Sequence, residues 1–313
     1  MPEQPTTQSP ESDLARGLAE FRQGRKSLLP VFELPTDDMP EEEQTEISRE
    51  RLIAYTYKKL IIELDLDNKL KDPNILQQLL EYLNRTKEAK IMSAVPFIRS
   101  VSDIKSMGIN LPEVNMDKLN SEINSLEFLN PVTDYLVEHF ELATTIPNEA
   151  AMACRTYSAI KSLGINLPKL VQDQIDTTIN SPEFQNQLIG VILRDLEYGT
   201  KYLDEAANAI IEISDILSLE IILPNHDWIE IEHAIMDTRF LFRLTEDFNS
   251  DFNIGKKQPR VAVGAICIAL AIQNIINHYS AIADEKEAVE AARRLQTAAD
   301  RTGIPPRPET KAF

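Results

Sequence analysis

Apolar residues recur every three to four positions along most of the chain, a period typical of amphipathic α-helices. The first such segment spans residues 48–66, with Ser48 as the expected helix cap, and another begins after Pro73. Leu, Ile, Ala, Glu, Lys and Gln dominate, and no alternating segment of Val, Thr and Tyr bounded by turns is present. The pattern therefore predicts an all-α protein.

Further helices follow one another with short linkers in the C-terminal half. Their predicted ranges are 188–196, 202–223, 228–249, 260–283 and 284–301. Asp227 is the expected N-cap of the helix at 228–249. The last helix is expected to begin at residues 284–287, DEKE, because negative charge in a first turn complements the helix macrodipole.

An internal repeat is the clearest sign of organisation in the sequence. Residues 99–130 and residues 155–186 are offset by 56 positions, and about half of the aligned positions are identical. Each copy predicts a helix that ends at Gly108 or Gly164, an extended Ile-Asn-Leu-Pro link and a second amphipathic helix. We therefore predict a duplicated αα-hairpin used as scaffold, since two units are too few for a free-standing solenoid.

Composition separates the two ends of the chain from its centre. Residues 1–46 are rich in Pro, Glu, Gln, Ser and Thr, which predicts a disordered acidic tail. Residues 302–313 contain three prolines and predict a second disordered tail. Residues 47–301 are expected to form a single large helical domain.

The formal net charge of −18 limits the classes of partner. Such a chain lacks the Lys/Arg surface that nucleic-acid binding needs, so we expect no nucleic-acid partner. Divalent cations, a basic protein partner or a homodimer fit better. No signal or transit sequence precedes the helices, and Cys154 and Cys267 lie far apart in apolar surroundings, which predicts free buried thiols and a cytoplasmic protein.

The longest apolar window, residues 261–276, includes Gln273 and Asn274. It falls short of the roughly 20 residues that cross a bilayer, so it predicts a buried core helix and no membrane span.

Residues 239–257, RFLFRLTEDFNSDFNIGKK, are the stretch that most resembles a functional site, because basic, acidic and again basic residues follow one another there. Their apolar members recur at helical spacing and predict a buried face: Phe240, Leu241, Leu244, Phe248 and Phe252. The polar members are expected along and beside the opposite face: Arg239, Arg243, Glu246, Asp247, Ser250 and Asp251.

Residues 198–301 resemble the C-terminal half of the α domain of class I terpene synthases, especially plant-type diterpene cyclases. The resemblance rests on an ordered series of motifs: YLDEA at 202–206, RLTEDFNS at 243–250, GK at 255–256, an apolar helix at 261–276 and EKEA at 285–288. It implies a terpene-synthase-like helical bundle that binds a prenyl diphosphate and, if active, cyclises it by Mg²⁺-assisted ionisation.

The same resemblance implies roles for individual residues. Metal ligands would be Glu246, Asp247, Ser250 and Asp251, with Glu246 and Asp247 catalytic, and the diphosphate would bind Arg243, Lys256 and Lys257. The sequence departs from the family at two places. Ile254 stands where a third ligand is expected, and Asp103 stands alone where the family has a second, aspartate-rich motif.

Two other interpretations remain open. Residues 239–257 could form a surface ladder of ion pairs on a non-catalytic helical interaction scaffold. Alternatively, residues 65–68, DLDN, are similar to the acid motif of class II terpene cyclases, which would make Asp67 the proton donor of a protonation-initiated cyclase. The repeat at 99–130 and 155–186 also resembles the units of the α/α barrels of class II cyclases and protein prenyltransferases.

Overall fold

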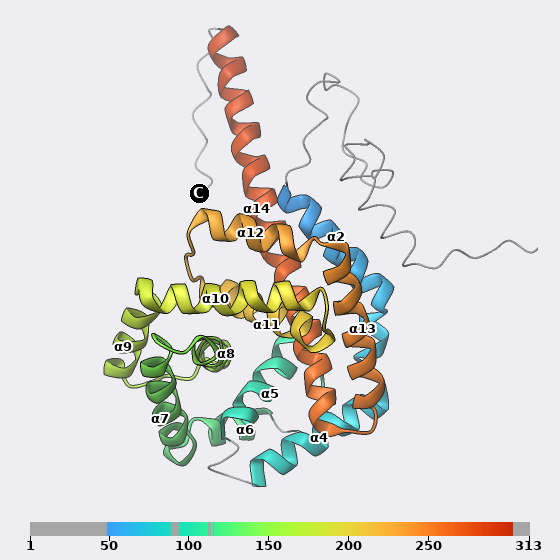
Figure 1. Ribbon diagram of the computed structural model, residues 1–313, viewed down its shortest axis with the longest axis vertical. Helices are drawn as coiled ribbons and strands as arrows, with labels where there is room; N and C mark the ends of the chain where they lie inside the picture. Colours follow the sequence, from blue (N-terminus) through green and yellow to red (C-terminus); the bar gives the residue numbers. More distant parts are fainter. Residues whose placement is uncertain (1–48, 89–93, 112–113, 115, 303–313) are drawn as a thin grey trace, which may run out of the picture.

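The computed structural model describes residues 49–88, 94–111, 114 and 116–302. The predicted tail at 1–46 and all but the first residue of the tail at 302–313 lie outside these residues. Every regular element in the described part of the chain is an α-helix, which confirms the predicted all-α class. Figure 1 shows their arrangement.

The helices succeed one another with short links. They are α2 (Arg49–Leu64), α3 (Leu66–Lys69), α4 (Pro73–Glu88), α5 (Ala94–Ser106), α6 (Met116–Ile123), α7 (Leu126–Leu142), α8 (Pro147–Leu163), α9 (Lys169–Ile179), α10 (Pro182–Gly199), α11 (Leu203–Leu219), α12 (Asn225–Ile235), α13 (Thr238–Gly255) and α14 (Pro259–Thr302).

Four of these helices form a closed inner ring. α5 packs on α8, α8 on α11, α11 on α14, and α14 returns to contact α5. The outer helices α7, α10 and α13 each pack on two successive members of the ring, and α4 packs on both α14 and α5. One apolar stripe on each helix is buried against its neighbours, and these stripes join in a single continuous core.

The helix bounds recur after 56 residues over more than a hairpin. The bounds of α11, α12 and α13 are those of α8, α9 and α10 displaced by this offset, and α14 begins at the position equivalent to the start of α11. Because the recurrence covers three helices, a duplicated αα-hairpin is not confirmed as the repeating unit.

The residue that follows each of α8 and α11, and its counterpart after α5, has a left-handed backbone. Gly108, Gly164 and Glu220 have φ of 63°, 69° and 55°. After each one, an isoleucine N–H donates to a carbonyl five residues back in the helix, as in the Ile165 N to Ile160 O bond of 3.1 Å. The predicted helix ends at Gly108 and Gly164 are therefore consistent with the structure.

Several of the predicted helix boundaries are wrong. The helix expected at 228–249 is two helices, because Asp237 caps α13 and accepts a hydrogen bond of 2.7 Å from the Arg239 N–H. The N-cap position of α12 is Pro224, and Asp227 lies inside its first turn. Apolar residues continue at helical spacing across this break, so periodicity alone did not reveal it.

The helices expected at 260–283 and 284–301 are one helix, α14, whose C-terminal turns project beyond the rest of the molecule in Figure 1. Residues 284–287, DEKE, lie inside it rather than at a helix start. The predicted helix at 188–196 is likewise part of the longer α10.

α14 is longer and more continuously apolar than predicted. Its portion Pro259–Lys286 has 28 residues and is apolar enough to cross a membrane, yet 56% of the most apolar window is buried inside the protein. It packs against α2, α11 and α13, which accounts for its composition as a core helix. The helix is weak evidence for a membrane span.

Candidate functional site

The apolar side of residues 239–257 lies in the core as predicted. Buried there are Phe240, Leu241, Leu244, Phe248 and Phe252. On the outer side, Arg243 Nη1 and Glu246 Oε2 form an ion pair of 2.7 Å with side chains 37% and 40% exposed. This pair is of the surface type, which contributes a few tenths of a kcal/mol (about 0.3–0.5).

The two lysines at the end of α13 lie apart from that ion pair. Lys256 Nζ is 2.9 Å from Asp72 Oδ2, an ion pair that lowers the pKa of Asp72. Lys257 is exposed and lines a shallow cavity with residues of α4 and the start of α14. Lys256 is therefore committed to a carboxylate in this structure, whereas Lys257 faces solvent.

Asp247 does not lie on the polar outer face, as its sequence position suggested, but is only 4% exposed. Burial raises its pKa to about 7, with a further contribution from Asp251 and Asp204. Burial also raises the pKa of Asp251 to about 6, again with help from Asp204. α13 and the start of α11 thus gather three carboxylates whose negative charges oppose one another.

The remaining predicted metal ligands do not complete a cluster. Ser250 is half-buried, and Glu246 is paired with Arg243. Asp103 lies on α5, where its partners are Cys267 and Arg155. Within the described residues, no three His, Cys, Asp or Glu side chains form a group that could hold a metal ion.

The burial of Asp247 should make the free energy of unfolding depend on pH. Its folded-state pKa of about 7 exceeds the ordinary value of 3.8, so the folded state binds more protons between pH 4 and 7, and stability falls as pH rises through that window. We expect Asp247→Asn to raise the free energy of unfolding by about 2 kcal/mol at pH 8 and to change it little at pH 4.

Urea unfolding of the Asp247→Asn protein and the parent at both pH values measures this difference. Glu246→Gln, on the exposed side of the same helix turn, is the matched control and should change stability by less than about 0.5 kcal/mol at either pH. A gain at pH 8 no larger than that at pH 4 would show that the Asp247 carboxylate is not desolvated.

A polar cavity of about 420 Å³ lies inside the ring of α5, α8, α11 and α14. Each helix contributes four positions with the same spacing, and these positions are equivalent under the 56-residue offset. They are Arg99, Ser102, Asp103 and Ser106 on α5; Arg155, Ser158, Ala159 and Ser162 on α8; Ile211, Ser214, Asp215 and Ser218 on α11; and Cys267, Leu270, Ala271 and Asn274 on α14.

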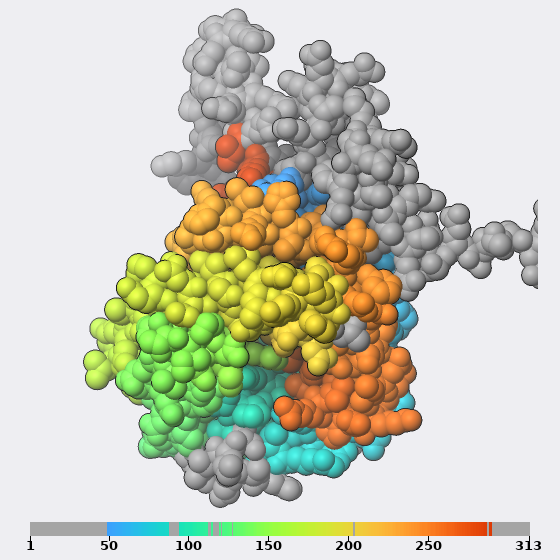
Figure 2. Space-filling view, in the orientation of Figure 1, coloured from blue at the N-terminus to red at the C-terminus, as the bar shows by residue number. Residues whose placement is uncertain are grey.

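The exposed serines of the C-terminal turns form the rim of this cavity. Ser106 and Ser162, which are equivalent in the repeat, share a hydrogen bond of 3.0 Å, and Ser218 is exposed on α11. Figure 2 shows the surface hollowed between the teal segment of α5, the yellow segment of α11 and the orange segments of α13 and α14. The cavity therefore opens to solvent.

A thiol links two charged groups in the interior. Arg155 Nη2 donates to Cys267 Sγ at 2.9 Å, and the Cys267 thiol donates to Asp103 Oδ2 at 2.9 Å. Burial and the adjacent Asp103 raise the pKa of Cys267, so the thiol stays protonated as this donor. Cys154 and Cys267 are both free and buried, as the sequence predicted.

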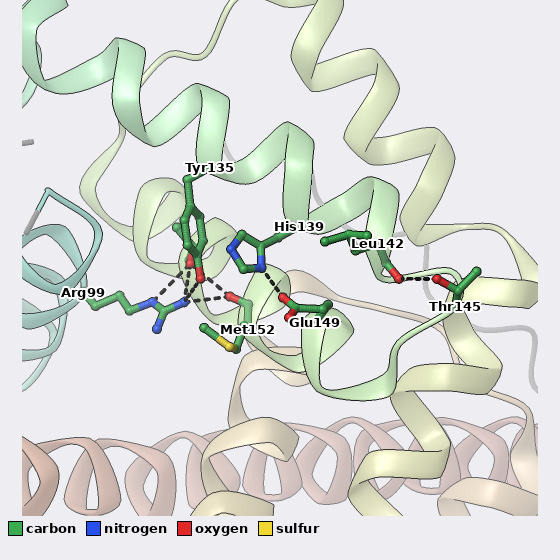
Figure 3. Close-up of polar contacts among 8 residues, drawn as sticks. Arg99, Tyr135, His139, Leu142, Thr145, Glu149 and Met152 are labelled. Atoms are coloured by element: carbon green, nitrogen blue, oxygen red, sulfur yellow. Dashed lines mark hydrogen bonds and ion pairs between the residues drawn. The ribbon is translucent and has the colours of Figure 1, made fainter. Parts of the chain in front are cut away.

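Neutral groups surround the second arginine of the cavity, as Figure 3 shows. Arg99 Nη2 donates to the Met152 carbonyl at 2.8 Å, Nε donates to Thr156 Oγ1 at 3.1 Å, and the Tyr135 hydroxyl lies 3.4 Å from Nη2. Next to them, the Tyr135 and His139 rings are in contact and tilted by 33°, and His139 pairs with Glu149. This second network fixes the guanidinium from the side of α7 and α8.

The charged side chains of the cavity shift one another's pKa values. Burial raises the pKa of Asp215 to about 7, although Arg155 opposes the shift. Burial lowers the pKa of Arg99, and the repulsion of Arg155 lowers it further. For Arg155 burial also lowers the pKa, but Cys267 and the two aspartates outweigh it and leave the pKa raised.

Two features of these charges bear on binding. Neither guanidinium forms an ion pair with a carboxylate of the described residues. In addition, Asp215 Oδ2 is buried and accepts no hydrogen bond there. Buried polar groups normally have hydrogen-bond partners in the protein, in water or in a ligand. The two guanidiniums could therefore bind an anionic group, and the Asp215 oxygen could accept a hydrogen bond from a ligand.

The sequence interpretation missed the α11 part of this cavity. Residues 211–224, IEISDILSLEIILP, match the start of both recognised copies in their serine spacing and their Leu-Pro end. Their Asp-Ile pair matches the first copy only, because the second copy has Ala159 at the aspartate position. The signal was a third copy at the same offset. This third copy is less evident in the sequence, because Glu220 replaces the glycine that marks the helix end in the other two copies.

Comparison of the chain with protein-family models, curated proteins and solved structures finds no match.

Proposed function

We propose that this protein binds a small polar molecule in the central cavity of its helical ring. The observation that carries the proposal is the convergence of equivalent positions from four helices on one cavity that contains two arginines and two aspartates. Ligand sites are concave, and a few polar groups in them converge on the ligand. The cavity of about 420 Å³ falls in the size range of small-molecule sites.

Stability alone is a poor reason to keep such a group of charges inside a core. Replacing buried ionic groups by apolar residues of similar volume is often neutral or stabilising. The unpartnered oxygen of Asp215 adds a cost of roughly 1–3 kcal/mol that a bound donor would remove. Ligand binding therefore accounts for these buried charged residues better than packing does.

Thermal denaturation of the full chain in the presence of a panel of amino acids, sugars, nucleotides and organic acids tests the proposal. We expect one class to raise the melting temperature in a concentration-dependent way, because a ligand that binds only the folded state stabilises it. Ser162→Trp on the exposed rim should block entry and remove this shift. Asn166→Trp, exposed outside the cavity, is the matched control and should retain it.

A shift that persists unchanged in Ser162→Trp would show that the ligand binds elsewhere, and no shift with any class would refute the proposal.

The second candidate is a terpene-synthase-like protein that binds a prenyl diphosphate with Mg²⁺. Its support is the resemblance of residues 198–301 and the gathering of Asp204, Asp247 and Asp251. A prenyl chain needs an apolar cavity, whereas the central cavity is lined by charged and hydroxyl-bearing side chains, so this candidate ranks second.

Incubation with Mg²⁺ and prenyl diphosphates of ten to twenty carbons tests this second candidate. It requires saturable, Mg²⁺-dependent binding or a hydrocarbon product, and loss of either in Asp247→Asn. Neither product nor binding would refute it.

A further inference from the structure

We infer that the ligand of the central cavity is a small zwitterion of the amino-acid type, whose carboxylate binds Arg99 and Arg155 and whose ammonium group binds Asp215. This inference rests on the proposed function, namely that the cavity holds a small molecule. It adds the chemical class and the orientation of that molecule.

The two guanidiniums provide the anion-binding half of the site. Both line the cavity, and repulsion by the positive charge of Arg155 lowers the pKa of Arg99. The hydrogen-bond partners of Arg99 are neutral, and Arg155 donates only to a thiol within the described residues. A carboxylate accepts charge-assisted hydrogen bonds from guanidinium groups and would relieve this repulsion.

The Asp215 carboxylate provides the cation-binding half. The Ser158 hydroxyl hydrogen-bonds to this carboxylate, but Oδ2 remains buried without a donor. The other aspartate differs, because Asp103 Oδ2 already accepts from the Cys267 thiol. An ammonium group has three donors and a positive charge, so it would satisfy the oxygen and hold the carboxylate ionised.

Charge balance favours a zwitterion over a simple anion or cation. Among the lining residues, Arg99 and Arg155 are offset by Asp103 and Asp215, and Lys161 is offset by Glu220. A ligand with net charge would therefore leave an unpaired charge in the cavity. A zwitterion brings both signs and no net charge. Its two groups also match the separate placement of the arginines on α5 and α8 and of Asp215 on α11.

Isothermal titration calorimetry of the full chain with each of the common α-amino acids tests the inference. We expect at least one to bind. Its N-acetyl derivative, which lacks the ammonium group, and its carboxamide, which lacks the carboxylate, should each bind at least about tenfold more weakly.

Two variants assign the orientation. Asp215→Asn preserves the size of the side chain. It should weaken binding of the amino acid about tenfold and leave the weak binding of the N-acetyl derivative unchanged. Arg99→Lys keeps the positive charge but removes the planar guanidinium group. It should weaken binding of the amino acid and of the N-acetyl derivative by the same factor. Circular dichroism confirms that each variant is folded before titration.

The outcomes separate this inference from the proposed function. Binding of a sugar, a nucleotide or a simple organic acid that Ser162→Trp blocks, without binding of any amino acid, would overturn the zwitterion and leave the proposed function standing. Equal binding of an amino acid and its N-acetyl derivative would also overturn it. If no compound binds, both fail.

Discussion

Arg155→Met is expected to lower the free energy of unfolding by about 3–5 kcal/mol at pH 8, because it removes the positive charge that faces two buried carboxylates. Asp103 and Asp215 both interact with Arg155, and its guanidinium also donates to Cys267. Methionine retains much of the volume, so the loss reports mainly on charge rather than on a cavity.

The pH dependence of this loss has a defined sign. Because the pKa of Asp215 is about 7, that group is largely neutral at pH 5, and one of the two carboxylates then needs no compensation. The destabilisation should therefore be smaller at pH 5 than at pH 8. Urea unfolding at the two pH values measures both differences.

Two further variants control the Arg155 experiment. Arg260→Met removes an exposed arginine near the start of α14 and should change stability by less than about 0.5 kcal/mol at both pH values. Asp215→Asn in the Arg155→Met background should restore part of the loss at pH 8, because it removes an unpaired buried charge. An equal loss at both pH values would mean that the charge of Asp215 does not contribute to it.

Gly255→Ala is expected to destabilise the protein by about 1–3 kcal/mol, although alanine is the better helix former. A Cβ at this position would lie 2.9 Å from the Cα and 3.0 Å from the backbone N of Ala262. Backbone atoms cannot rotate away as a side chain can, so α13 and α14 would have to move apart at this contact.

Gly190→Ala in α10 is the matched control. An added Cβ there meets no atom within 4 Å, so the substitution should stabilise the protein by roughly 0.5–1 kcal/mol through helix propensity alone. Thermal unfolding of the two variants should therefore give changes of opposite sign. Stabilisation by both would show that α13 and α14 tolerate a wider spacing.

The same close approach recurs one repeat earlier. A Cβ on Gly199 would lie 2.9 Å from the Cα of Ala206, and the pair Gly199 and Ala206 precedes Gly255 and Ala262 by the 56-residue offset. Both pairs join the end of an outer helix to the start of the next inner helix. Small residues at these positions let the chain turn tightly and keep the inner helices in one ring.

The sequence by itself determined the secondary-structure class and the local order of the chain. Apolar residues at helical spacing dictate helices, and they also dictate which face is buried, as the five apolar residues of α13 show. The predicted ends at Gly108 and Gly164 follow from a purely local requirement, a positive φ that glycine adopts without strain.

Long-range contacts decided the remainder. Asp247 belongs to the polar pattern of its helix, yet packing of α13 buries it, because burial depends on neighbouring helices as well as on spacing along one helix. The break before Asp237 and the single length of α14 were likewise set by packing and capping rather than by periodicity.

The cavity is the plainest case of a feature that only the tertiary structure decided. Arg99, Asp103, Arg155, Asp215 and Cys267 lie on four helices, and no short motif joins them. The 56-residue repeat was visible in the sequence, but closure of the inner ring by contact between α14 and α5 was not. That closure turns equivalent positions on separate helices into the walls of one polar cavity.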